Sequence, residues 1–104
     1  MFARYFCLKK KRMETVLSIS DLYSKAREYE KTEKLLEAVS LYEKVSTSAN
    51  TYIASFIRLG NIYEMLHLKE KAIATYKRGI AVAEKYGNKK AMRYLSYMLL
   101  GLIE

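Results

Sequence analysis

The feature that most constrains the fold of this chain is an internal repeat. When the sequence is shifted by 34 residues, small and aromatic residues coincide in the same order. The coinciding pairs are Leu22 with Phe56, Ala26 with Gly60, Tyr29 with Tyr63, Ala38 with Ala72, Tyr42 with Tyr76 and Val45 with Gly79, and a second shift carries Tyr63 to Tyr97. Because tyrosine is 10 of the 104 residues, one tyrosine match means little, but ordered matches of several residue types are hard to obtain by chance. A period of this length predicts stacked supersecondary units.

The repeated unit is predicted to be helical. The chain contains no proline, which breaks helix interiors, and its apolar residues recur at steps of three and four. These stripes predict helices over about 13–31, 35–45, 53–66, 69–86 and 88–103. Polar residues at 46–50 predict a loop with Asn50 as the next N-cap, while Gly87 is suited to a left-handed helix end and Asn88 to the cap of the last helix. The predicted fold class is all-α.

The second unit carries a recognisable motif, Phe56-x-x-Leu59-Gly60-x-x-Tyr63 followed by Ala72-x-x-x-Tyr76. It closely resembles the tetratricopeptide repeat, and the stretch after Tyr76 is similar to the end of small stand-alone proteins of that family. The resemblance implies a right-handed solenoid within residues 13–104, with repeat one at about 19–52, repeat two at about 53–86 and a closing helix at about 88–103. The implied packing positions are Leu22, Ala26, Tyr29, Ala38, Tyr42, Phe56, Leu59, Gly60, Tyr63, Ala72 and Tyr76.

The same resemblance implies a binding surface and no catalysis. In this family the first helix of each unit lines a concave groove that receives a peptide or helix of another protein. The corresponding groove residues here are Tyr23, Arg27, Glu30, Lys31, Ile57, Asn61, Glu64 and Met65. Some relatives clamp a C-terminal carboxylate at such positions, but only Asn61 suits that role, because Ile57 and Met92 stand where charge is needed. We expect an adaptor or scaffold, with solvated positions that bind nothing as the alternative.

The last helix is apolar around nearly its whole circumference. The end of a helical stack normally keeps a polar outer face, so an apolar one predicts a second binding surface. The residues expected to mediate self-association or partner docking are Leu95, Met98, Leu99, Leu102 and Ile103. The alternative is that this helix folds back over the groove and covers its own apolar face.

The net charge of +8 is unevenly distributed. Residues 1–12 contain five Lys and Arg and no acidic residue, which leaves only +3 for the other 92 residues. We expect this basic segment to be a flexible tail. Its Phe2, Tyr5 and Phe6 beside the cations support an alternative function, binding to nucleic acid or to an anionic membrane surface.

The small number of reactive side chains argues against catalysis and metal binding. One cysteine, Cys7, and one histidine, His67, leave no nucleophile–histidine constellation and no pair of histidines for a metal. The four glycines are too far apart for a phosphate-binding loop, so we expect no enzyme activity, no cofactor and no metal. His67 is expected in a solvated turn. A single cysteine and the lack of a long apolar stretch favour a cytoplasmic location.

Overall fold

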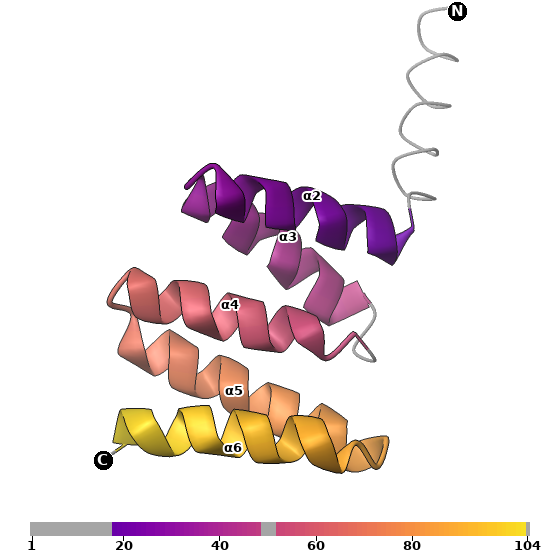
Figure 1. Ribbon diagram of the computed structural model, residues 1–104, viewed down its shortest axis with the longest axis vertical. Coiled ribbons are helices and arrows are strands. Elements are labelled where there is room, and N and C mark those ends of the chain that lie inside the picture. Colours follow the sequence, from indigo (N-terminus) through magenta and orange to yellow (C-terminus); the bar gives the residue numbers. More distant parts are fainter. Residues whose placement is uncertain (1–17, 49–51, 104) are drawn as a thin grey trace, which may run out of the picture.

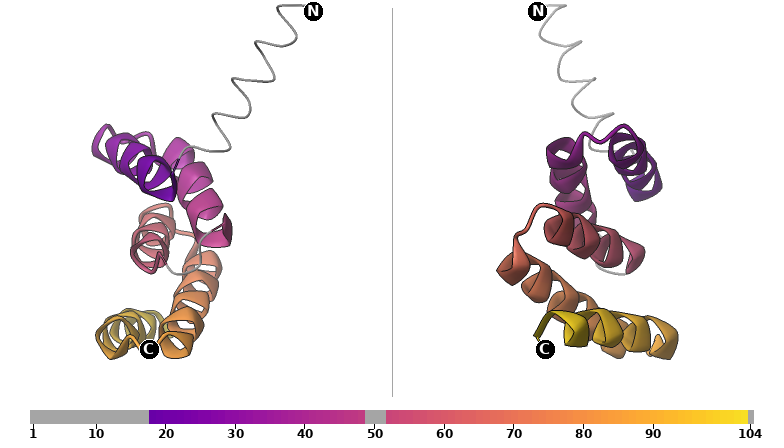
Figure 2. Two further views of the ribbon diagram at one scale, coloured as in Figure 1. Left: turned by 90° about the vertical axis from the view of Figure 1, so that its right-hand side faces the viewer. Right: turned by 60° about the vertical axis from the view of Figure 1, so that its left-hand side comes forward.

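The computed structural model describes residues 18–48 and 52–103, and within these ranges all regular secondary structure is α-helix (Figure 1). The helices are α2 (Ile19–Lys31), α3 (Leu35–Ser48), α4 (Ala54–Met65), α5 (Lys69–Lys85) and α6 (Lys89–Ile103). Successive helices run antiparallel to each other and are stacked along the long axis of the molecule (Figure 1). Figure 2 shows that α2, α4 and α6 form one layer and that α3 and α5 form the other. The fold is a helical-repeat solenoid of two helix-turn-helix units and a closing helix.

The turns between helices repeat as closely as the helices do. Glu33 and His67, which lie 34 residues apart, take left-handed conformations with φ of 63° and 61°. In both turns the following residue donates a backbone hydrogen bond of 2.8 Å to the carbonyl oxygen five residues earlier, from Lys34 to Tyr29 and from Leu68 to Tyr63. This arrangement satisfies carbonyl groups at the helix end. Gly87 ends α5 in the same way with a φ of 68°, as its sequence context predicts.

Side-chain caps mark where α2 and α6 begin. Ser18 is extended and its Oγ accepts a hydrogen bond from the Asp21 amide at 3.2 Å, so α2 begins at Ile19. The prediction that this helix starts at Met13 is therefore wrong, and residues 13–17 lie outside the described ranges. The predicted cap of α6 is confirmed, because Asn88 Oδ1 accepts from the Ala91 amide at 3.1 Å. The predicted cap at Asn50 lies outside the described residues.

Helix α3 extends to Ser48, so the loop predicted from residue 46 begins too early. The hydroxyls of Ser46 and Thr47 donate to the carbonyl oxygen of Glu43 at 3.0 and 2.9 Å. Such local bonds allow serine and threonine to remain helical although both residues favour loops and caps.

The core is built where small residues let helices approach. Ala26, Ala38 and Ala72 are fully buried. A Cβ atom on Gly60 would lie 2.6 Å from Cζ and 2.8 Å from Cδ1 of Tyr76, so only glycine fits against this ring. The whole cluster comprises Ala26, Ala38, Tyr42, Leu59, Ile62, Tyr63, Ala72, Tyr76 and Leu95. Among the other packing positions, Phe56 is buried and Leu22 and Tyr29 are half-buried.

The closing helix does not continue the packing register that the second 34-residue shift suggests. Tyr63 is 7% exposed, whereas Tyr97, its partner in that shift, is 77% exposed. The contact from α6 to α5 is made by Leu95, whose Cδ1 atom would lie 3.0 Å from a Cβ on Gly79. Equating Tyr97 with Tyr63 is therefore wrong, because α6 presents a different set of positions to the core.

Candidate functional site

The candidate site is the surface of the layer formed by α2, α4 and α6. In this layer α4 is set back between its two neighbours (Figure 2, left). The predicted groove residues lie on two of these helices, Tyr23, Arg27, Glu30 and Lys31 on α2 and Ile57, Asn61, Glu64 and Met65 on α4. Arg27, Lys31 and Met65 are exposed, and the other five are half-buried. These half-buried residues are not all available to a ligand, because several already have partners within the chain.

Both predicted groove carboxylates accept hydrogen bonds from buried tyrosines of their own unit. Glu30 Oε1 accepts a hydrogen bond of 2.8 Å from the hydroxyl of Tyr42. One repeat later, Glu64 Oε2 accepts one of 2.5 Å from the hydroxyl of Tyr76, which also lies 2.7 Å from Asn61 Oδ1. Hydrogen bonds to charged groups contribute about 1.5–3 kcal/mol each. These groove residues therefore stabilise the helix pair of each unit.

The acidic side chains also join the two units. Arg58 Nη1 lies 3.4 Å from Glu30 Oε2, which connects α4 to α2. Glu43 Oε1 accepts from the Tyr63 hydroxyl at 2.9 Å and lies 3.3 Å from Arg78 Nη2. Burial, and then the hydrogen bond to Glu43, raise the pKa of Tyr63 to about 12.

The hydroxyls of the two other buried tyrosines are also hard to ionise. Burial is the main cause that raises the pKa of Tyr42 and of Tyr76 above the ordinary value, and the adjacent carboxylates of Glu30 and Glu64 raise it further. Tyr23 lies beside this network, with its ring centroid 5.7 Å from that of Tyr42 and 4.9 Å from that of Tyr52. The α2 side of the surface is therefore packed and internally bonded.

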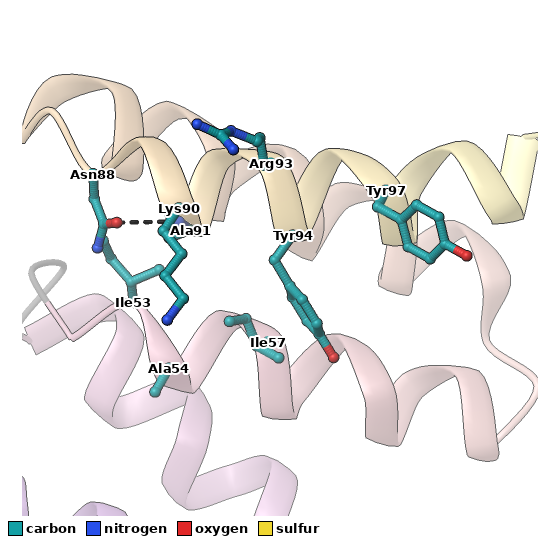
Figure 3. Close-up of a pocket in the computed structure, with 9 residues that line it drawn as sticks. All are labelled: Ile53, Ala54, Ile57, Asn88, Lys90, Ala91, Arg93, Tyr94 and Tyr97. Carbon is teal, nitrogen blue, oxygen red and sulfur yellow. Dashed lines mark hydrogen bonds between the residues drawn. The ribbon is translucent and has the colours of Figure 1, made fainter.

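The α4 side of the surface opens instead into a cavity of about 680 Å³ (Figure 3). The cavity is lined by Ile53, Ala54, Ile57, Asn88, Lys90, Ala91, Arg93, Tyr94 and Tyr97. Ile57 of α4 points towards α6, and Tyr94 of α6 points back towards α4 (Figure 3). A mostly apolar wall with a few polar groups at its edge is typical of a binding pocket. Ile57 is the one predicted groove residue that lines it.

The residues predicted for self-association through the last helix face mainly inward. Leu95 is fully buried, and Met98, Leu99 and Leu102 pack against the core, whereas Ile103 is 56% exposed. The other large exposed apolar residues of α6 are Tyr94, Tyr97 and Leu100. The helix lies against α5 and leaves the cavity beside α4 open, so the alternative, in which it folds back and covers the groove, is wrong.

Sequence reasoning missed the tyrosines and cations of α6 that line the cavity. A signal was present, because Leu95, Met98 and Leu102 follow steps of three and four along one face of the helix. Tyr94 and Tyr97 fall outside that stripe. The second 34-residue shift matches Tyr97 to Tyr63, and this match obscures the second face of the helix.

Other expectations concern features apart from the cavity. His67 is exposed in the turn between α4 and α5. Within residues 18–48 and 52–103, no group of three His, Cys, Asp or Glu side chains is arranged to hold a metal ion. None of the described helices is long and apolar enough to cross a lipid bilayer. Cys7 and the basic segment at residues 1–12 lie outside the described ranges.

Two solved structures have a fold similar to that of this chain. No family model and no curated protein matches the chain. A solution NMR structure of a tetratricopeptide repeat domain protein from Salinibacter ruber is similar, with 29% identity and a TM-score of 0.79 over 83% of this chain and 87% of that one. A crystal structure of a tetratricopeptide repeat domain protein from the same organism has 29% identity and a TM-score of 0.75 over 82% and 94% of the two chains. The repeat, the turns and these two similar structures together support a tetratricopeptide-type family for this chain.

Proposed function

We propose that this protein binds a segment of another protein in the cavity between α4 and α6. The tetratricopeptide-type fold supports a general protein-interaction module. The observation that carries the specific proposal is the cavity of about 680 Å³, whose walls include Ile57, Tyr94 and Tyr97. Such a function agrees with the role of an adaptor or scaffold.

The exposure of the cavity tyrosines supports binding at this surface. Tyr94 and Tyr97 are 47% and 77% exposed, although each carries a large apolar ring. Tyrosine is enriched among the residues that dominate protein interfaces, because its ring supplies contact area and its hydroxyl supplies a hydrogen bond. A partner side chain inserted between these rings and Ile57 removes apolar surface from water.

Peptide selection tests this proposal. The full chain is immobilised and panned against a random peptide library, and the selected peptides are titrated calorimetrically. Replacement of Tyr94 or Tyr97 by alanine is expected to cost more than about 1 kcal/mol of binding free energy, which is about fivefold in Kd. The matched control is Tyr86→Ala, because Tyr86 is 51% exposed but does not line the cavity. If Tyr86→Ala weakens binding as much as Tyr97→Ala does, or if no peptide is selected, the cavity is not the binding site.

Self-association through α6 is a second candidate function. It would use the exposed residues Tyr94, Tyr97, Leu100 and Ile103, since Leu95 is buried. Light scattering at rising protein concentration measures it, with Leu100→Glu as the variant expected to remove association. A particle mass that stays that of one chain throughout excludes it.

A further inference from the structure

The positive charge of the described residues lies in the part of the chain that contains the cavity. Residues 18–48 contain five Lys and Arg against six Asp and Glu, a net charge of −1. Residues 52–103 contain nine Lys and Arg against three Glu, a net charge of +6. Since α4 and α6 both belong to the second range, the cavity lies in the positive part of the molecule. An electrostatic field of this sign attracts acidic partners.

Two cations lie at the cavity itself. Lys90 and Arg93 belong to its lining, which contains no acidic residue. Lys90 extends from α6 towards α4 (Figure 3). In the described part of the chain the ion pairs are Arg58 with Glu30 and Arg78 with Glu43, so neither Lys90 nor Arg93 has a carboxylate partner there. Both are available to a carboxylate from outside.

Lys90 also lies in the first turn of α6, where positive charge is unfavourable. The first turn of α6 has no acidic residue and begins with Lys89 and Lys90. The other helices that begin with a charged first turn carry an acidic residue there, as Asp21 does in α2 and Glu70 in α5. Cations at a helix N-terminus are unfavourable, because that end already carries partial positive charge. A bound carboxylate would offset both the cations and the helix end.

We infer that the occupant of the cavity is an acidic segment of a partner protein in which a large apolar side chain is flanked by carboxylates. This inference rests on the proposed function and specifies its ligand. The apolar side chain contacts Ile57, Tyr94 and Tyr97, while the carboxylates approach Lys90 and Arg93. The apolar wall and the short extent of the cationic rim favour a peptide over a nucleic acid, which needs a longer basic track to follow its phosphates.

Defined peptides test the inference with the full chain. The first probe is a fluorescent peptide with a central phenylalanine flanked by glutamates on both sides. The others replace the glutamates by glutamines or lysines, or the phenylalanine by glycine. Anisotropy should show about tenfold tighter binding of the glutamate peptide than of the glutamine peptide at low salt, and this difference should shrink as salt is added. The glycine peptide should bind weakly.

A charge swap gives the sharpest control. The double variant Lys90→Glu with Arg93→Glu is expected to prefer the lysine peptide to the glutamate peptide, which inverts the wild-type order. Lys77→Glu, which changes an exposed cation of α5 outside the cavity, should keep the wild-type order. Circular dichroism confirms that each variant is folded.

The outcomes separate this inference from the proposed function. If the glutamate and glutamine peptides bind equally, and Tyr97→Ala weakens both, the acidic preference is refuted while the cavity remains a peptide site. If no probe peptide binds and library selection also fails, both proposals fall. An oligonucleotide that displaces the glutamate peptide and binds more tightly overturns the peptide assignment. If the protein forms a dimer and the glutamate peptide does not dissociate that dimer, the peptide assignment is overturned as well.

Discussion

Replacement of Gly60 by alanine tests the packing that holds the second unit together. Gly60 lies in α4 directly against the ring of Tyr76, and an added Cβ atom would lie 2.6 Å from Cζ and 2.8 Å from Cδ1. Tyr76 is fully buried, and its hydroxyl is held by Asn61 at 2.7 Å and Glu64 at 2.5 Å. The ring cannot turn aside without breaking these bonds, so the overlap must be relieved by separating α4 from α5.

The expected magnitude follows from two opposing effects. Alanine is more favourable than glycine inside a helix by about 1 kcal/mol. Overpacking a filled core costs about 1–3 kcal/mol, and the upper value applies here because a rigid ring meets the new methyl group. The net loss in free energy of unfolding is therefore about 2 kcal/mol. For a domain of this size that corresponds to a fall in Tm of about 8–16 °C.

Thermal and urea unfolding of the full chain, followed by far-UV circular dichroism, measures this loss. The matched control is Gly101→Ala in α6, since a Cβ atom there would have no neighbour within 4 Å. That variant should gain up to about 1 kcal/mol from helix propensity alone. If Gly60→Ala is as stable as Gly101→Ala, the close contact with Tyr76 does not restrict the fold and the reasoning is refuted.

Three further predictions concern helix ends and pH. Asn88→Ala removes the side-chain cap of α6 and should lower the free energy of unfolding by about 1 kcal/mol in urea melts, whereas an unchanged midpoint would contradict the cap. His67→Gly should raise the Tm, because glycine takes the φ of 61° without steric cost, and a lower Tm would mean that the imidazole makes a stabilising contact. Tyr63 is protonated in both states below its unfolded pKa of about 10. As the pH rises from there to its folded pKa of about 12, only the unfolded form has ionised, so stability falls. Alkaline urea melts should show a weaker fall for Tyr63→Phe, and an identical slope would refute the assignment.

The helical fold and its repeat follow closely from the sequence. Proline is absent throughout, and the 34-residue period predicts two similar helix pairs in which Ala26, Ala38 and Ala72 lie at the crossings. Gly87 and Asn88 act at the junction of α5 and α6 as their residue types predict. These features depend on local backbone preferences and on which residues share a helix face, and both are encoded within a few neighbouring residues.

The availability of the groove residues depends on the tertiary structure. Glu30 and Glu64 have the polarity of ligand-binding residues. Only the packing of the helices brings the hydroxyls of Tyr42 and Tyr76 close enough to donate hydrogen bonds to their carboxylates. The sequence pattern places these carboxylates on a helix face. It does not reveal that the hydroxyl of the next helix ends within hydrogen-bond distance.

The difference between what the sequence determines and what the tertiary structure decides is clearest in the closing helix α6. Its sequence predicts a helix that is apolar on almost every side, and the stripe of Leu95, Met98 and Leu102 is only one of its apolar faces. The tertiary structure decided between those faces. It placed Leu95 against Gly79 and left Tyr97 beside the cavity, because burial depends on where α6 crosses α5 and not on hydrophobicity alone.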